Sequence, residues 1–225
     1  MTDGILLIDK PSEMTSFGVV ARVRRVLSEQ AGKKVKVGHT GTLDPFATGL
    51  MIIVVGKECK NAGHYTKLDK VYEATIRLGQ TSTTGDPEGE IADVNTTQPT
   101  LEQISAVVRQ FTGEISQRPP MFSAIKINGQ RAYKLARAGE VVEMPSRIIT
   151  VHSLEVIDYT YPQLKIRTHV SSGTYIRTLA EDIGTALGTG AYCPQLRRTA
   201  ISTYDIASAV PLGDILTQHD KGVRI

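Results

Sequence analysis

The sequence of 225 residues contains two cysteines, no tryptophan and no long hydrophobic run. Cys59 and Cys193 are too few for a disulfide framework, and neither has ligand partners at zinc spacing. The N-terminal apolar run, residues 5–8, is too short for a signal peptide, and no later run approaches the roughly 18 residues of a membrane span. The five histidines are scattered along the sequence. We therefore expect a cytoplasmic protein with no membrane contact, no metal site and no cofactor.

The sequence also has little excess of either charge, because its net charge is only +3. Such a balance permits a nucleic-acid partner without requiring one. Residues 22–36 are an exception, with six basic side chains against Glu29 alone: Arg22, Arg24, Arg25, Lys33, Lys34 and Lys36. This cluster is either a solvated helix face or a phosphate-binding surface.

With 40% apolar residues, the chain can bury a core as one or two domains. Hydrophobic periodicity and turn residues predict helices at 16–30, 57–68 and 101–111 and another after 171–173, with strands at 4–9, 50–55, 71–78, 148–159, 163–170 and 196–204. Ser16 is the expected N-cap of the first helix and Gly32 its end. Residues 81–99 read as a loop. The pattern predicts an α+β fold with a mixed, largely antiparallel central sheet flanked by helices and loops.

The glycine-spaced segment 37–50 stands out because it places Asp44 in a turn directly before an apolar run. Pro45 restricts its own φ angle and biases Asp44 away from helix, so the loop could hold a carboxylate rigidly. A plain Asp-Pro turn explains the same two residues. Within the segment, residues 38–41 also match the GxxG loop of a KH module, but there the loop joins two helices, and here a strand follows.

Three other groups could carry chemistry. Tyr72 opens a strand, so its ring lies either at a cleft edge or on a sheet face. Arg177 is placed on the first turn of a helix, where it opposes the helix dipole unless it has an anionic partner. Residues 196–198 contain two consecutive arginines, which fit a strand with two phosphate contacts or an exposed sheet edge guarded by charge.

These segments together resemble the TruB family, the bacterial tRNA pseudouridine-55 synthases. The resemblance is carried by six motifs in order: residues 4–16, 38–49, 72–81, 120–126, 173–177 and 196–198. It implies the pseudouridine synthase fold with a catalytic cleft. It also implies isomerisation of the T-loop uridine of tRNA, position 55, to pseudouridine by base flipping, without cofactor.

The resemblance assigns roles to single residues. Asp44 matches the catalytic aspartate, and a carboxyl group of ordinary pKa, about 3.9, is already ionised at pH 7. Arg177 is expected to pair with Asp44, and Tyr72 to stack on the flipped uracil. His39 corresponds to the histidine that fills the vacated space. Tyr175 and Leu196 are expected to line the uracil pocket, and Lys10, Lys126 and the cluster at 22–36 to bind the RNA.

The predicted organisation is a catalytic domain over residues 1–210 and a short tail over 211–225. Within the domain, the basic, turn-rich residues 113–147 match the family's RNA-gripping insertion and are expected to be mobile without RNA. Many relatives carry a PUA-type domain after the catalytic one, and about twenty residues follow Tyr204 here. We therefore expect recognition of the T-stem-loop alone, by a monomer.

Three other functions remain to be weighed. A guide-RNA-dependent pseudouridine synthase shares the catalytic motif, and an RNA-folding factor acting on the T-arm would need no chemistry. An aspartate-nucleophile hydrolase lacks a second carboxylate at useful spacing. Replacing Asp44 by asparagine separates isomerisation from RNA folding, because chaperoning should survive and isomerisation should vanish.

Overall fold

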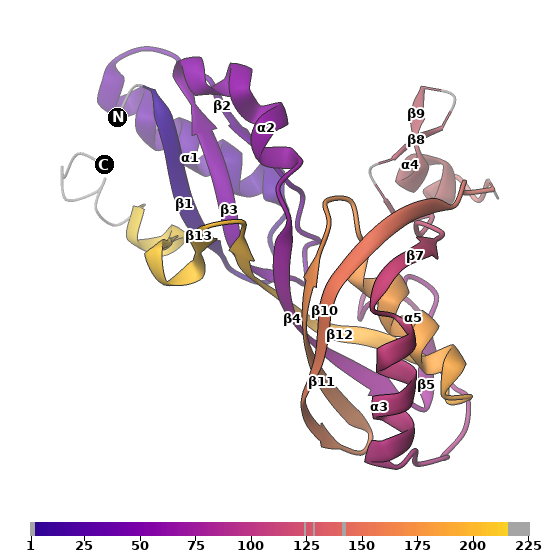
Figure 1. Cartoon of the computed structure of the whole chain (residues 1–225). Coiled ribbons are helices and arrows are strands. Elements are labelled where there is room, and N and C mark those ends of the chain that lie inside the picture. Colours follow the sequence, from indigo (N-terminus) through magenta and orange to yellow (C-terminus); the bar gives the residue numbers. More distant parts are fainter. Residues whose placement is uncertain (1–2, 124, 128, 141–142, 216–225) are drawn as a thin grey trace. The chain divides into compact units, whose positions relative to one another are not determined.

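We describe a computed structural model over residues 3–123, 125–127, 129–140 and 143–215 (Figure 1). The chain forms two compact units: unit 1 comprises Met1–Glu73 and Leu196–Ile225, and unit 2 comprises Ala74–Gln195. The sequence predicted one domain ending at residue 210. That division into a domain and a tail stays a prediction. Leu212 and Ile215 of the predicted tail are buried, and its residues 216–225 lie outside the described residues.

Within the described residues, ten strands form one sheet, and eight of them follow the order β14-β1-β3-β12-β4-β11-β10-β7. The pairs β1–β3, β2–β3, β10–β11, β10–β7 and β12–β13 are antiparallel, and β1–β14 and β3–β12 are parallel. The sheet is therefore mixed and largely antiparallel, which confirms the predicted fold class. β4 (Lys70–Leu78) and β12 (Ala191–Ile201) each contribute residues to both units.

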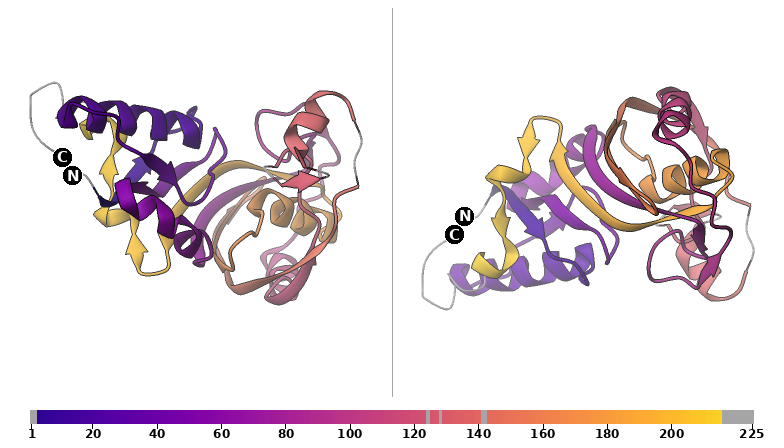
Figure 2. Two further views of the ribbon diagram at one scale, coloured as in Figure 1. Left: turned by 90° about the horizontal axis from the view of Figure 1, so that it is seen from above. Right: turned by 90° about the horizontal axis from the view of Figure 1, so that it is seen from below.

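Unit 1 is built around β3 (Thr48–Val55), which is buried along nearly its whole length. On one face, Leu50, Ile52 and Val54 form a cluster with Ile201, against which Ala62 and Tyr65 of α2 (Ala62–Thr66) pack. Figure 2 shows α1 (Ser16–Ala31) on the other side of the strands. The remaining elements of this unit are β1 (Gly4–Lys10), β2 (Val37–His39), η1 (Gly56–Asn61), β13 (Tyr204–Asp205), η2 (Ile206–Ser208) and β14 (Val210–Pro211).

The ends of α1 show how local sequence determines a helix. Gly32 has a φ angle of 62°, and its amide closes the last turn, as predicted. The predicted N-cap was wrong by one residue: Thr15 caps the helix by accepting the amide of Gly18 at 3.0 Å. Ser16 is instead the first helical residue, and its hydroxyl is buried.

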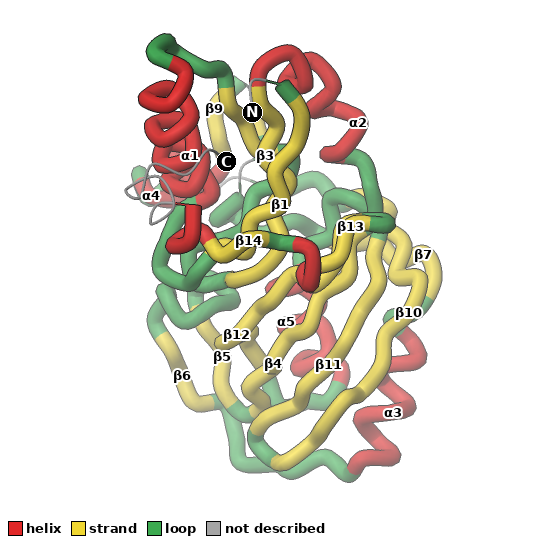
Figure 3. Tube along the Cα trace, turned by 90° about the vertical axis from the view of Figure 1, so that its left-hand side faces the viewer, coloured by secondary structure: helices red, strands yellow, loops and turns green. Residues whose placement is uncertain are grey.

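Unit 2 contains β11 (Gln163–Val170), β10 (Arg147–Thr160) and β7 (Gly113–Gln117) beside the unit 2 part of β4. Figure 3 shows α3 (Leu101–Gln110) and α5 (Ile176–Ala186) on one side of these strands. Residues 81–99 are not all loop, because β5 (Gln80–Ser82) and β6 (Ile91–Asp93) pair there. The predicted helix at 57–68 is likewise divided in unit 1 into η1 and α2.

The segment 113–147 contains a second small ribbon, β8 (Lys126–Ile127) with β9 (Gln130–Arg131), followed by α4 (Ala132–Arg137). Asn128, between the two strands of this ribbon, lies outside the described residues. No helix within the described part of the chain is long and apolar enough to cross a membrane.

Candidate active site

Asp44 lies in the loop between β2 and β3, half-buried, in a turn where the amide of Ala47 donates to the Asp44 carbonyl at 3.2 Å. The buried hydroxyl of Ser16 accepts the amide of Leu43 at 2.8 Å and donates to the Leu43 carbonyl at 2.9 Å. Both main-chain polar groups of the residue before Asp44 are thereby bound to α1. The loop is anchored beside its carboxylate, as the sequence predicted for a rigid mount.

Lys10 is a second anchor of the same loop. Its side chain is fully buried, and its ammonium group donates to the carbonyls of Pro11 at 2.8 Å, Met14 at 2.6 Å and Pro45 at 3.1 Å. The prediction that Lys10 binds the RNA backbone is corrected, because a fully buried ammonium group does not face solvent or a phosphate. Lys10 instead fixes the main chain next to Asp44.

Arg198 is the third anchor. Its side chain, 1% exposed, donates to the carbonyl of Leu50 at 2.7 Å and to that of Gly41 at 3.2 Å. Arg197 forms a two-pronged pair with Asp9, at 2.7 and 3.1 Å. The predicted exposed edge is wrong, since β12 lies between β3 and β4. The predicted pair of phosphate contacts is corrected as well, because the Arg198 guanidinium is buried against carbonyl groups.

Close packing against β12 requires a glycine at position 49. Gly49 has a φ angle of 108°, a conformation that other residues avoid. A Cβ atom there would lie 2.7 Å from the main-chain nitrogen of Arg198 and closer still to its carbonyl oxygen. Gly49, the second residue of β3, therefore allows Arg198 to approach the Asp44 loop.

His39 ends β2, beside Thr40 of the loop. Burial lowers the pKa of its imidazole, and the positive charge of Arg198 lowers it further. Its Nδ1 atom is buried without a hydrogen-bond partner among the described residues. His39 is therefore a neutral side chain at neutral pH, which suits contact with an uncharged base.

The predicted site residues are divided between the units. Unit 1 holds His39, Asp44 and the buried side chains of Tyr72 on β4 and Leu196 on β12, as well as Lys10. Unit 2 holds Lys126, Tyr175 and Arg177. The pairing of Arg177 with Asp44 stays a prediction. Lys126 is exposed on the β8–β9 ribbon, where it is accessible to a partner.

Asp86 is a residue that the sequence reasoning missed. Its carboxylate accepts Arg177 Nη1 at 2.9 Å, and both side chains are buried, 3% and 6% exposed. Arg177 also donates to the carbonyls of Thr84 at 2.7 Å and Phe122 at 2.8 Å. The sequence indicated that Arg177, near a helix start, needs an anionic partner. That requirement was the one hint that a carboxylate in the predicted loop 81–99 could be buried beside it.

Glu181 lies one helical turn after Arg177 on α5. Burial raises its pKa to about 7, and the neighbouring charge of Arg177 opposes the shift. Glu181 also lines a cavity of about 620 Å³ together with Arg118, Pro119, Pro120, Met121, Glu143, Met144 and Thr178. The acid therefore titrates near neutrality beside the Asp86–Arg177 pair.

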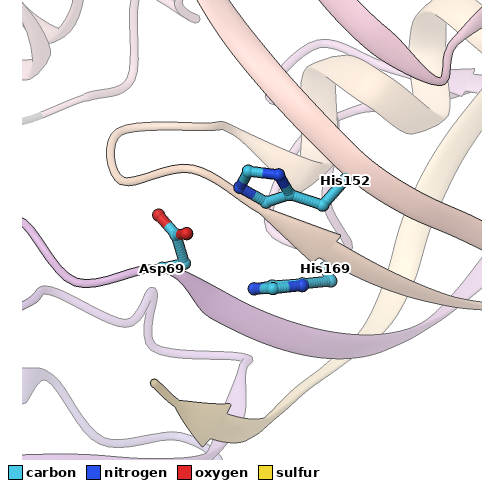
Figure 4. Close-up of side chains that lie close together, drawn as sticks. All are labelled: Asp69, His152 and His169. Atoms are coloured by element: carbon cyan, nitrogen blue, oxygen red, sulfur yellow. The ribbon is translucent and has the colours of Figure 1, made fainter.

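Two of the five histidines are not scattered. His152 and His169, on β10 and β11, have ring centroids 4.6 Å apart (Figure 4). A register shift between Val151 and Ser153 makes His152 the extra residue of a β-bulge, which brings the two rings close together. Within unit 2 they offer two imidazoles, fewer than the three protein ligands typical of catalytic zinc sites. Asp69, also drawn in Figure 4, belongs to unit 1.

Comparison with known proteins gives a consistent result. Residues 24–176 match the model of the TruB family pseudouridylate synthase N-terminal domain, and residues 177–222 that of the tRNA pseudouridylate synthase B C-terminal domain. The chain is 46% identical over 212 residues to tRNA pseudouridine synthase B of Azoarcus sp. (strain BH72), covering 94% of this chain and 69% of the relative. It is 44% identical over 227 residues to that of Thermobifida fusca (strain YX), covering 97% of this chain and 76% of the relative.

Solved structures agree. The chain resembles one in the crystal structure of a Cbf5-Nop10-Gar1 complex with a TM-score of 0.75 and 28% sequence identity. The match covers 98% of this chain and 57% of the solved one. The predicted pseudouridine synthase fold is thereby confirmed.

Proposed function

The chain belongs to the TruB family of pseudouridylate synthases, and from that premise we propose that it isomerises the T-loop uridine of tRNA, position 55, to pseudouridine. The observation that carries this proposal is the loop around Asp44, which Ser16, Lys10 and Arg198 fix through main-chain bonds. A carboxylate mounted so firmly is suited to act on one atom of a bound base.

The reaction breaks the bond between uracil N1 and ribose C1′ and forms one between C5 and C1′. The hydrogen on C5 leaves as a proton and N1 takes one up, so no electrons are gained or lost and no cofactor is needed. Asp44 serves as the nucleophile or base.

The other site residues bind the base. The target uridine must leave the T-loop, at a cost of a few kcal/mol. Neutral His39 occupies the vacated space, Tyr72 stacks on the uracil, and Leu196 and Tyr175 line its pocket. Arg177 is held by Asp86, and we expect it to pair with the Asp44 carboxylate.

The test uses the purified protein without added cofactor and an unmodified tRNA transcript that carries tritium at uridine C5. We expect release of tritium by the wild type and none by Asp44→Asn. Asp158→Asn, which changes an exposed aspartate, is the matched control and should retain activity. No release by folded wild-type protein would overturn the proposal.

A second function, folding of the tRNA T-arm, remains compatible with the basic surface of α1, on which Arg22 and Arg25 are exposed. It predicts that Asp44→Asn still promotes tRNA folding while it releases no tritium. Loss of both in the same variant would exclude an independent folding activity.

The setting of the reaction is also part of the proposal. We expect a monomer that acts on the T-stem-loop in the cytoplasm, without a metal ion. Light scattering of the purified protein measures its mass, and an assay after treatment with a chelator tests the metal requirement. A stable dimer, or loss of activity on chelation, would contradict these expectations.

A further inference from the structure

The main chain of Tyr175 is held by one side chain. Tyr175 precedes α5, with φ −103° and ψ 112°. Gln117, fully buried at the end of β7, accepts the Tyr175 amide at 2.8 Å and donates to the Tyr175 carbonyl at 3.0 Å. A carboxamide carries an acceptor oxygen and a donor nitrogen on separate atoms, so it can bind both main-chain atoms at once.

The ring of Tyr175 is held by another side chain. The guanidinium carbon of Arg147, at the start of β10, lies 4.9 Å from the ring centroid. This is the geometry of a cation–π contact. Arg147 also donates to the carbonyl of Gly173. Gly173 has a φ angle of 88°, a conformation that other residues avoid.

These two contacts have a common origin. Arg147 and Gln117 are opposite each other as register partners on the antiparallel strands β10 and β7. A single cross-strand pair therefore contacts Tyr175 at its amide, its carbonyl and its ring. Neither Gln117 nor Arg147 belongs to the motifs on which the family resemblance was recognised.

We propose that the Gln117–Arg147 pair is a positioning device that fixes Tyr175 for recognition of the flipped uracil. The inference rests on the proposed function, which gives Tyr175 its place in the uracil pocket. Because the guanidinium group covers one face of the ring, the base meets its other face or its edge. A ring fixed before binding loses little conformational freedom when the base arrives.

The kinetic test compares Arg147→Ala with Arg109→Ala, which removes an exposed arginine of α3 in the same unit. With tritiated tRNA we expect Arg147→Ala to lower kcat roughly tenfold or more, as for a group that orients the substrate pocket. The dissociation constant for tRNA should stay near the wild-type value. Arg147→Lys, which keeps the cation, should recover part of the loss, and Arg109→Ala should behave as wild type.

A double-mutant cycle separates positioning from a direct contact with RNA. In a Tyr175→Leu background, Arg147→Ala should have little further effect, because the ring that it orients is gone. An equal effect in both backgrounds, or weaker tRNA binding with unchanged kcat, would overturn the proposal. Gln117→Met, which keeps the length of the side chain but removes both bonds, should show the same dependence on Tyr175.

A readout without catalysis keeps the test independent of the proposed function. Tyrosines labelled with ¹³C in their rings are observed by NMR, and the Tyr175 signal is assigned from Tyr175→Phe. Loss of the guanidinium group should shift and broaden that signal in Arg147→Ala but not in Arg109→Ala. An unchanged signal would overturn the clamp, whereas an inactive wild type with the expected shift would overturn only the proposed function.

Discussion

Units 1 and 2 each bury an arginine, and they stabilise its charge in different ways. In unit 1, Arg198 donates to the carbonyls of Leu50 and Gly41. In unit 2, Arg177 meets the carboxylate of Asp86 in addition to two carbonyls. Carbonyl dipoles satisfy hydrogen bonds without cancelling a net charge, whereas a carboxylate does both.

The difference is visible in the neighbouring groups. Arg198 contributes to lowering the pKa of His39 and that of buried Lys70, which falls to about 8 mainly through burial. Arg198 therefore places a positive charge near the Asp44 loop, which suits an RNA substrate. In unit 2 the ion pair fixes the direction of Arg177. Arg198 of unit 1 thus supplies positive electrostatic potential, and Arg177 of unit 2 is a hydrogen-bond donor with a fixed direction.

Breaking the ion pair of unit 2 should have the largest effect. Asp86→Ala leaves the buried charge of Arg177 without its carboxylate, which costs about 3–5 kcal/mol of unfolding free energy. Asp86 also accepts the Thr84 hydroxyl and the Glu88 amide, so its turn should loosen. Urea unfolding measures the loss, with Asp158→Asn as the exposed control. A cost below about 1 kcal/mol would refute the assigned role of the pair.

Removing the unit 1 arginine should have the next largest effect. Arg198→Met leaves the buried carbonyl of Leu50 and the partly buried carbonyl of Gly41 unsatisfied, at a cost of about 2–4 kcal/mol. The pKa of His39, measured by NMR titration, should rise, because a positive neighbour is gone. Arg197→Met, which breaks a partly exposed pair with Asp9, should cost about 1 kcal/mol or less and is the matched control.

The lowered pKa of His39 also determines how the unfolding free energy changes with pH. A lowered pKa means that the folded protein binds fewer protons than the unfolded chain. The unfolding free energy should therefore fall as the pH drops below about 6.5, and this slope should be smaller in Arg198→Met. A steeper slope in that variant would contradict the assigned influence of Arg198 on His39.

A glycine substitution tests the close approach of β12 to β3, with a smaller expected loss of unfolding free energy. Gly49→Ala should cost more than about 2 kcal/mol, because its Cβ would press on the main chain of Arg198. Gly32→Ala has a comparable positive φ angle, 62°, but open space around it, so it should cost only about 1 kcal/mol. Equal costs for the two variants would mean that strain alone, without the contact, explains the glycine.

The smallest expected effect concerns Glu181. Its pKa is raised to about 7, so the folded protein holds this proton more tightly than the unfolded chain does. Between about pH 5 and about pH 8 the group should therefore lower the unfolding free energy by about 1–3 kcal/mol, and Glu181→Gln should remove this loss. Glu143→Gln, at an exposed acid lining the same cavity, should leave the pH dependence unchanged.

Periodicity in the sequence was enough to predict α1, β4, α3 and α5, because each presents one apolar face to a core. It could not distinguish Thr15 from Ser16 as the cap of α1. Both hydroxyls suit an N-cap, and the choice depends on Leu43, which is distant in sequence and binds Ser16. Tertiary contact overruled a local preference.

The candidate site was predicted in the same uneven way. The roles that motifs suggest for Asp44, Tyr72 and Arg177 stay predictions. Charge led to wrong environments for Lys10 and Arg198, which a sequence places at the surface by default. Asp86 was missed because an aspartate in a polar stretch rich in glycine and proline reads as a turn. Its burial depends on packing against α5, which no local pattern reveals.

The burial of Lys10 makes it a chemical reporter of the Asp44 loop. An amine-reactive reagent modifies exposed lysines such as Lys33 and Lys126 at once, but it reaches Lys10 only while the bonds to Pro11, Met14 and Pro45 are broken. The rate at which Lys10 becomes labelled, measured by mass spectrometry, therefore reports how often the loop opens. If tRNA binds over Asp44, the labelling rate of Lys10 should fall, even in a variant that cannot carry out the reaction.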